Sequence, residues 1–490
     1  MEDLRRLTSG MMPATSTQRP PLSSPLSRFD ASYAGPGAGA GAGSCAVAEA
    51  RCEVTTEEKP SAGRVCAAGD YLAFVGGRGW KQREPMLQAG RISSADIHLV
   101  DVTTGFFDTG FSVALDPSRG LVWSSGGENR TKAFTIGNSS HSSCCYTLDG
   151  GPLLGMLGGR VYASHGAGKL SYWDIDRLTP QGEWIEAGEL SDFDEEDEEG
   201  NPVEHLHNGV RVRNCLGESW NDEAAAAEAT AGDRPHGSIQ LLPGALPSTP
   251  EQRVPLQLLA LGPEPESGAA PQQAAVLFRG SGSLWVYDWP TASLSALLTG
   301  FMGCLNAASV CPQLPHLVAA GSKDSTARVW DLRSHACTHL LASRSSLRIG
   351  ALALADDQGQ PFCFTSNAGA ESVLCFDLRM RRCLYELATG NTNVCSLQWH
   401  SPSRSLFAVG ECDYIDRHGH DYEYGAMGGY SWPKWDAHSH VLVRYAFRDS
   451  PNPRVLPPEA ELDEDASEYS DSEEEAEAAK TWRPRERDYW

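Results

Sequence analysis

The chain has 490 residues, of which 41% are hydrophobic and 21% charged, and its formal net charge is −24 at pH 7. No apolar run approaches the roughly 20 residues of a membrane-spanning helix, so we expect no membrane partner. The acidic balance argues against nucleic acid as a primary partner, because phosphates would be repelled and no basic stripe is visible along the sequence.

The chain begins with a segment rich in Ser, Pro and Gly at residues 1–43, which we interpret as a disordered leader. Within it, residues 4–29 hold four Arg and no acidic residue, a composition that resembles an organellar transit peptide. Glu2 and Asp3 precede this stretch, however, and no amphipathic period is evident. We therefore expect a cytoplasmic or nuclear protein, with an organellar one as the alternative. The 14 cysteines form no Cys-x-x-Cys pair, which also fits a reducing compartment.

Residues 44–449 are predicted to form an all-β domain, because short apolar stretches alternate with turn residues and helical periodicity is scarce. Each predicted unit is a strand, a turn and a second strand. The first strands are expected at residues 71–75, 120–124, 160–163, 275–278 and 317–320. The residues that mark the second strands are Val100, Phe134, Trp173, Tyr287, Trp330 and Phe376. A seventh unit is expected at residues 394–399, 405–409 and 440–447.

The unit at residues 317–333 carries the most specific motif, LVAAGSKDSTARVWDLR. It resembles the WD-repeat family, in which a Ser or Thr, a turn Asp and a strand-end Trp form a buried hydrogen-bonded set. Ser322, Asp324 and Trp330 occupy those three places, whereas the usual Gly-His pair of the family is absent. Most successive units are 34 to 46 residues apart. The resemblance and this repetition imply a seven-bladed WD-repeat β-propeller.

Two segments bear on how the ring is completed. Residues 45–55 partly alternate in polarity, so they could add the outer strand that closes the ring, or they could be a linker. The interval of 114 residues between Trp173 and Tyr287 exceeds one blade. It predicts a mostly disordered insertion at residues 179–255, within which residues 238–242 could pair as a strand.

Most of the excess negative charge lies in two appendages. Residues 186–199 hold nine acidic and no basic residues, and residues 459–477 hold eleven acidic and no basic ones. Runs of like charge this dense do not pack and usually stay disordered. We therefore expect an acidic insertion and an acidic, disordered C-terminal tail at residues 450–490, attached to a nearly neutral propeller.

A second insertion is predicted at residues 411–439, inside the last blade. The spacing of its candidate metal ligands matches no compact zinc motif, so we expect no metal there. These candidates are Cys412, His418, His420, His438 and His440. Its aromatic residues suggest a partner-recognition loop, since Tyr and Trp dominate interaction hot spots, with packing on the propeller as the alternative. They are Tyr414, Tyr422, Tyr424, Trp432 and Trp435.

No catalytic motif is present in the sequence. It contains no Gly-x-Ser-x-Gly elbow, no phosphate-binding Gly-rich loop followed by Lys-Ser/Thr, and no His-Glu-x-x-His. We expect no enzyme activity and no cofactor. The sequence instead predicts a non-catalytic protein–protein interaction scaffold, a monomeric propeller within a larger complex.

Two adjacent blades end in Asp-x-Arg, with Asp331 and Arg333 in one and Asp377 and Arg379 in the next. In the WD-repeat proteins that act as substrate receptors of cullin-4 ubiquitin ligases, this blade end is the adaptor-docking box. The resemblance therefore implies that the two guanidinium groups bind that adaptor, although the second copy has Phe376 in place of Trp. The alternative is that both Arg residues are solvated rim residues.

The acidic tail suggests a second function, that of a chaperone or assembly factor for a basic client such as a histone or ribosomal protein. Ser470 and Ser472 each have Glu three residues further on, the pattern of acidophilic kinases, and are phosphorylation candidates. A purely solubilising tail is the simpler alternative.

Overall fold

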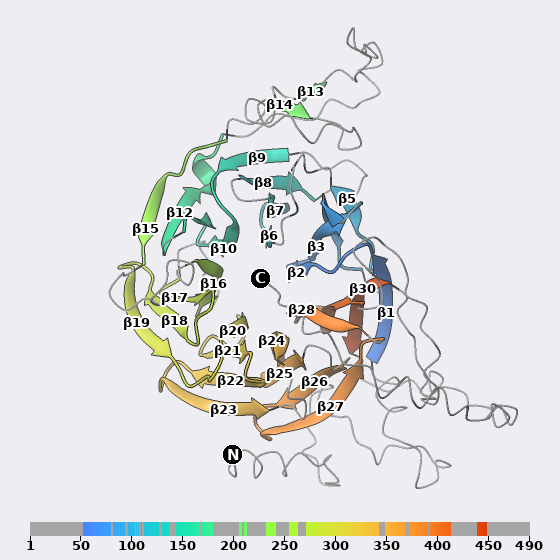
Figure 1. Ribbon diagram of the computed structural model, residues 1–490, viewed down its shortest axis with the longest axis vertical. Coiled ribbons are helices and arrows are strands. Elements are labelled where there is room, and N and C mark those ends of the chain that lie inside the picture. Colours follow the sequence, from blue (N-terminus) through green and yellow to red (C-terminus); the bar gives the residue numbers. More distant parts are fainter. Residues whose placement is uncertain are drawn as a thin grey trace, which may run out of the picture.

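Figure 1 shows the computed structural model as a ring of small antiparallel sheets around a central axis. The described residues form seven four-stranded sheets, which are the blades of a β-propeller, and one separate two-stranded sheet. The structure describes residues 52–79, 82–93, 97–102, 104, 106, 109, 112–126, 130–136, 144–166, 168–179, 205–207, 210–212, 232–241, 254–262, 271–342, 348–367, 372–390, 392–412 and 439–447.

The first four blades follow the order of the chain, apart from one insertion. Blade 1 contains β2 (Arg64–Ala68), β3 (Tyr71–Arg78), β4 (Glu84–Arg91) and β5 (Val100–Val102). Blade 2 contains β6 (Ser112–Asp116), β7 (Leu121–Gly126), β8 (Arg130–Thr135) and β9 (Cys144–Asp149). Blade 3 contains β10 (Leu153–Leu157), β11 (Arg160–Ser164), β12 (Lys169–Asp174) and β15 (Gly237–Gln240). Blade 4 contains β16 (Pro255–Leu261), β17 (Gln273–Phe278), β18 (Leu284–Asp288) and β19 (Ser293–Leu298).

The last three blades complete the ring. Blade 5 contains β20 (Leu305–Val310), β21 (Leu317–Ser322), β22 (Thr326–Asp331) and β23 (Ala336–Ala342). Blade 6 contains β24 (Ile349–Asp357), β25 (Gln360–Asn367), β26 (Ser372–Asp377) and β27 (Arg382–Ala388). Blade 7 contains β28 (Asn393–His400), β29 (Ser405–Glu411), β30 (His440–Phe447) and β1 (Cys52–Lys59). The predicted all-β, seven-bladed architecture is confirmed.

The second strand of each blade is buried on both faces, because every blade packs against a neighbour on each side. All six residues of β21 are buried, and β29 is buried at six of its seven positions. Such strands read as continuous apolar runs, whereas the outer strand β19 alternates between exposed and more buried residues. Close packing also explains Gly321, since an added methyl group there would collide with Ile349 of the next blade.

Aromatic side chains fill the space between neighbouring blades. Between blades 6 and 7, Phe364 stacks on Trp399 with ring centroids 5.9 Å apart, and Phe447 lies 6.0 Å from Trp399. All three side chains are buried. Replacing a buried aromatic of this kind with Ala typically costs 3–5 kcal/mol.

The ring closes through its first described strand. β1 pairs antiparallel with β30 in continuous register from Cys52 opposite Phe447 to Lys59 opposite His440. The predicted closing strand is therefore confirmed for residues 52–55 and extends four residues further, while residues 45–51 lie outside the described residues. Pairing the two ends of the domain leaves no open sheet edge at the junction.

The second strands of the predicted two-strand units correspond to the third strands of the blades, and for blade 1 the prediction that Val100 marks this strand is wrong. The third strand is β4, which pairs with β3 from Tyr71 opposite Arg91 to Arg78 opposite Glu84. Val100 belongs to β5, the outer strand. The sequence of β4, EPMLQAGR, hides a strand because it contains a Pro and a Gly, which weaken the β signal.

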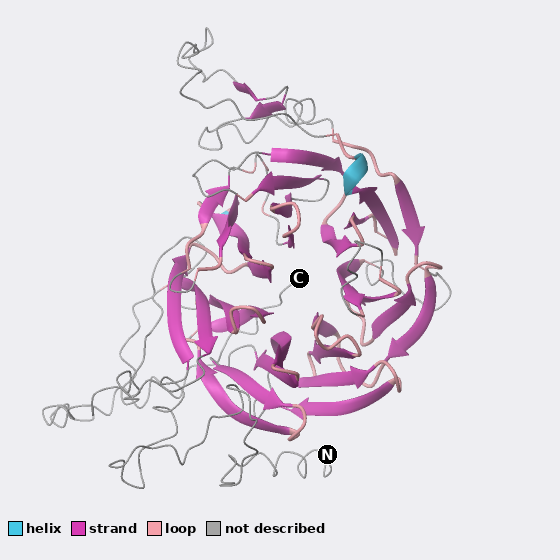
Figure 2. Cartoon of the chain, turned by 180° about the vertical axis from the view of Figure 1, so that it is seen from behind, coloured by secondary structure: helices cyan, strands magenta, loops and turns pink. Residues whose placement is uncertain are grey.

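The outer strand of blade 3 is β15, which pairs with β12 after an excursion of more than 50 residues. Residues 238–240, within the stretch predicted to pair as a strand, do so. Most of the predicted insertion at residues 179–255 lies outside the described residues; the exceptions are its two ends, residues 232–241, and the hairpin of β13 (His205–His207) and β14 (Val210–Val212). Seen from behind, the ring is almost entirely strand, and η4 (Ile175–Arg177) is the one named helix of the described residues (Figure 2).

Candidate protein-interaction face

The third strands of blades 5, 6 and 7 end on the same face of the ring, because equivalent strands of a propeller run in the same direction. We call this the lower face. The turn after β22 carries Arg333, and the turn after β26 carries Arg379. The fold therefore places the two predicted docking arginines on one face, in adjacent blades.

Arg333 is held by Asp331 of its own turn. Its Nε donates to Asp331 Oδ1 at 3.0 Å and its Nη2 to Oδ2 at 2.5 Å, while its backbone N–H also donates to Oδ1 at 2.9 Å. The Arg333 side chain is 70% exposed and that of Asp331 16%. The hydrogen bond from the guanidinium lowers the pKa of Asp331 to about 2.

Arg379 repeats this arrangement one blade further on. Its backbone N–H donates to Asp377 Oδ1 at 2.8 Å, and its Nη2 donates to Oδ2 at 2.9 Å. Asp377 is completely buried, whereas Arg379 is 44% exposed. In both blades, a carboxylate beneath the turn orients a guanidinium that still has donor groups facing solvent.

The strand-end Asp has a structural role that does not depend on Arg. In blade 4, Asp288 accepts hydrogen bonds from the backbone N–H of Thr291 at 3.1 Å and from its hydroxyl group. In blade 3, Asp174 instead pairs with Arg160 of the neighbouring strand and with Arg177, three residues further on. Neither blade has Arg two residues after this Asp. In blade 4 the Asp therefore serves the turn itself, as short polar side chains often do. The architecture does not require the Arg that follows it in blades 5 and 6.

The outer strand of blade 5 contacts the arginine turn of blade 6. Nε2 of His339, on the outer strand of blade 5, lies 2.6 Å from the backbone oxygen of Leu378 in blade 6. Burial lowers the pKa of His339, and the charge of nearby Arg381 acts in the same direction. Arg381 ends the turn of blade 6, and Arg382 begins β27, where it lies opposite Asp377 in the strand register. We call the four residues Arg333, Arg379, Arg381 and Arg382 the arginine face; the first three are exposed and Arg382 is half-buried.

Ser322 and Asp324 of the predicted blade set lie toward the opposite end of blade 5, whereas Trp330 immediately precedes Asp331 in β22. The backbone N–H of Asp324 donates to Ser322 Oγ at 3.2 Å, and Asp324 Oδ2 accepts from the backbone N–H of Met302 at 2.8 Å. Asp324 thus ties its turn to the connection from blade 4. Trp330 packs its ring on Phe301, with centroids 5.4 Å apart. The structure brings Ser322 and Asp324 together, and Trp330 contributes through ring packing.

Other predicted residues are only partly described. Cys412 and His440 are brought together, since the backbone N–H of Cys412 donates to His440 Nδ1 at 3.1 Å. In the described part of the chain, no group of three or more His, Cys, Asp or Glu is placed to hold a metal ion. The remaining candidates lie outside the described residues: His418, His420, His438, Tyr414, Tyr422, Tyr424, Trp432, Trp435, Ser470 and Ser472.

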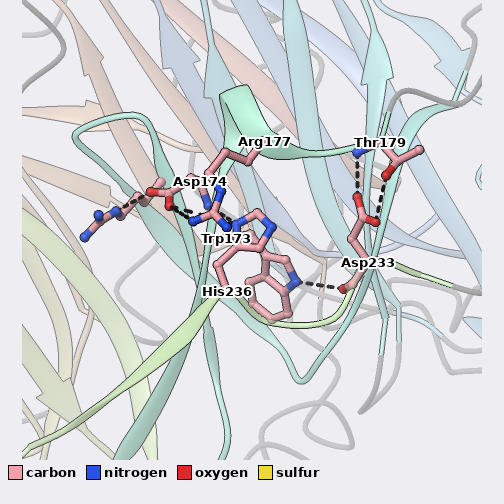
Figure 3. Close-up of polar contacts among 7 residues, drawn as sticks. Trp173, Asp174, Arg177, Thr179, Asp233 and His236 are labelled. Carbon is pink, nitrogen blue, oxygen red and sulfur yellow. Dashed lines mark hydrogen bonds and ion pairs between the residues drawn. The ribbon is translucent and has the colours of Figure 1, made fainter.

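A polar cluster that the sequence analysis missed joins the two ends of the acidic insertion (Figure 3). The carboxylate of Asp233 accepts hydrogen bonds from the backbone N–H of Thr179 at 2.7 Å and from its Oγ1 at 3.1 Å. The backbone oxygen of Asp233 accepts from Trp173 Nε1 at 2.8 Å, and His236 Nδ1 accepts from the backbone N–H of Asp174 at 2.9 Å. The insertion therefore leaves and re-enters blade 3 at one fixed point.

No known protein-family model and no curated protein matches this sequence. Among the described residues, no helix has the length and apolar character needed to cross a membrane. The fold nevertheless defines the class: the chain is a seven-bladed β-propeller protein, an arrangement consistent with the WD-repeat resemblance. Propellers of this kind commonly serve as non-catalytic interaction scaffolds.

Proposed function

We propose that this propeller is a non-catalytic interaction scaffold whose arginine face docks a partner, and that the partner is the adaptor of a cullin-4 ubiquitin ligase. One observation carries the proposal. Four blades end their third strand in Asp, yet only the two adjacent blades 5 and 6 follow it with Arg two residues later. If the architecture required an Arg at this position, Arg would follow the Asp in all four blades and not only in two adjacent ones.

The geometry supports recognition of carboxylate or carbonyl groups. The Asp beneath each Arg fixes the plane of the guanidinium before a partner arrives, so less side-chain freedom is lost on binding. The solvent-facing N–H groups of Arg333 and Arg379 can then donate paired hydrogen bonds to an acceptor. Exposed, oriented Arg side chains are frequent among the residues that dominate binding energies.

Affinity purification of the full-length chain tests this proposal. We expect the wild type to recover the cullin-4 adaptor and an Arg333→Ala, Arg379→Ala variant to lose at least about tenfold of it. The matched control is Arg279→Ala, Lys323→Ala, which removes two exposed positive charges from turns at the opposite ends of the strands. Absence of the adaptor from the wild-type sample, or equal recovery by all three proteins, would rule the docking out.

A second candidate is the acidic-tailed chaperone or assembly factor for a basic client. It is favoured by the charge distribution, because residues 459–477 alone carry eleven acidic groups. Such a segment would attract a basic client over long range and shield its charge.

A further inference from the structure

The C-terminal strand ends on the lower face, next to blade 6. β30 is the third strand of blade 7. In the strand register, Ala446 is the equivalent of Asp331 and Asp377, and the last residue of β30, Phe447, is the equivalent of Leu332 and Leu378. The backbone N–H of Phe447 donates to the oxygen of Arg404 at 3.0 Å. Its ring lies 6.5 Å from that of Tyr385, on the outer strand of blade 6. The structure thus fixes the point from which residues 448–490 leave the propeller.

The exposed groups beside this exit point are mainly positive. Three carboxylates of the lower face of blades 5 and 6 are paired with guanidinium groups: Asp331 is 16% exposed beside Arg333, Asp377 is fully buried under Arg379, and Asp357 is 2% exposed and accepts from Arg404 Nε at 3.1 Å. A fourth, Asp356, is half-buried and accepts a hydrogen bond from the backbone N–H of Gly359. Among the described residues, no carboxylate lies within ion-pair distance of Arg381. The arginine face is therefore a positive surface on a chain whose net charge is −24.

The acidic run of the tail begins close enough to reach this surface. Eleven residues, 448–458, separate Phe447 from the run at 459–477. Fully extended, they span at most about 40 Å. Blade 7 packs directly on blade 6, as the contact of Phe447 with Tyr385 shows, and packed sheets lie only about 10 Å apart. Attachment through so short a connection gives an effective local concentration on the order of millimolar.

We propose that residues 459–477 bind the arginine face of the same chain and compete there with the docking partner. The regulatory half of this inference rests on the proposed function, whereas the binding of the tail does not. Eleven acidic groups without a basic one complement Arg333, Arg379, Arg381 and Arg382. Phosphorylation of Ser470 and Ser472 adds negative charge to the same run and strengthens the contact.

Two other segments also join the propeller on this face, and neither fits as well. The leader enters through Cys52, opposite Phe447, but it holds four Arg and no acidic residue between positions 4 and 29. The acidic insertion leaves after the third strand of blade 3, and blade 4 separates it from the arginine face. The C-terminal tail alone combines negative charge with attachment at the neighbouring blade.

Binding of a fluorescein-labelled peptide of residues 455–480 tests the inference by fluorescence anisotropy in 50 mM NaCl. The receptors are the full-length chain and a chain that ends at residue 450, which retains every described strand. We expect the truncated chain to bind the peptide at least about tenfold more tightly, because the attached tail no longer competes. Raising the salt to 300 mM should weaken binding severalfold, since exposed charges are then screened.

Variants of the truncated chain identify the surface. Arg379→Ala, Arg381→Ala should weaken peptide binding at least about tenfold, and the Arg279→Ala, Lys323→Ala control less than twofold. Arg381→Glu alone leaves the contact between Asp377 and Arg379 intact, so it must also weaken binding if folding is unaffected. Equal binding by the full-length and truncated chains, or by the arginine variants, overturns the inference. The inference is also overturned if only the deletion of residues 1–43 abolishes peptide binding, because the peptide would then bind the leader and not the arginine face.

The adaptor measurement separates this inference from the proposed function. Truncation at residue 450 should raise adaptor recovery severalfold. If the peptide binds as expected but no adaptor is recovered, the tail contact stands and the proposed partner is wrong. If adaptor recovery depends on Arg333 and Arg379 but is the same with and without the tail, the proposed function stands and the competition is wrong.

Discussion

The two residues of each Asp-x-Arg turn have different roles. Asp331 and Asp377 accept backbone hydrogen bonds within their turns, so they stabilise the local structure. Arg333 and Arg379 contribute donor groups to the surface. A substitution of the Asp should therefore change both the turn and the orientation of the Arg, whereas a substitution of the Arg should change mainly binding.

The titration of Asp331 checks this division. Because Arg333 holds its pKa at about 2, below the unfolded value near 3.9, Asp331 stabilises the fold above about pH 4 and loses this contribution as the pH falls toward 2. We expect carboxyl-carbon NMR to show this low pKa in the wild type and a return toward 3.9 in Arg333→Ala. An unchanged pKa in Arg333→Ala would contradict the role assigned to the guanidinium, and Arg279→Ala serves as the control.

At the scale of elements, ring closure depends on a strand distant in sequence from its partner. β1 pairs with all eight residues of β30. It also contributes Lys59, which is buried, donates to Gln88 of blade 1 and pairs with Glu57. Burial lowers the pKa of Lys59. The closing strand therefore joins blade 7 to blade 1 by side-chain contacts as well as by the backbone.

Deleting residues 1–59 should open the ring. The edge of β30 then loses its backbone partners, and we expect the midpoint of thermal unfolding to fall by at least roughly 10 °C, with aggregation through the exposed strand edge. Deleting residues 1–43, which keeps β1, should leave the midpoint within about 2 °C. Circular dichroism melts of the two deletions and the full chain compare them. Equal midpoints for all three would show that β1 is dispensable.

At the scale of the whole molecule, most of the excess negative charge lies in segments outside the propeller blades. Residues 459–477 lie beyond the last described strand, while the described lower face of blades 5 and 6 presents exposed arginines. The acidic tail can therefore meet either a basic client or the arginine face of its own chain, and these two contacts compete.

The chaperone alternative makes a distinct prediction. If the tail recruits a basic client, deleting residues 459–490 should weaken binding of a purified core histone at least about tenfold at 50 mM NaCl and far less at 300 mM. A tail of the same composition in shuffled order should restore binding, because the attraction depends on charge and not on sequence. Equal binding with and without the tail at low salt would remove this function. Light scattering and anisotropy both measure the outcome.

Much of the fold could be predicted because buried second strands leave a strong apolar pattern. The runs at residues 71–75 and 317–320 were recognisable for this reason, and β4 was not, because Pro85 and Gly90 interrupt it. The cluster around Asp233 could not be predicted. Its partner Thr179 lies 54 residues away, and nothing local distinguishes that Asp from many others on the surface.

The sequence by itself determined the repeating strand pattern, the seven units and the placement of charge, since these follow from local composition and spacing. Only the tertiary structure decided which residues share a face. It placed Arg333 and Arg379 on one face of adjacent blades, put their Asp partners beneath them, and brought the exit of the acidic tail next to blade 6. The reason is physical: blade-to-blade packing and ring closure are long-range contacts, and no stretch of sequence shorter than the whole domain specifies them.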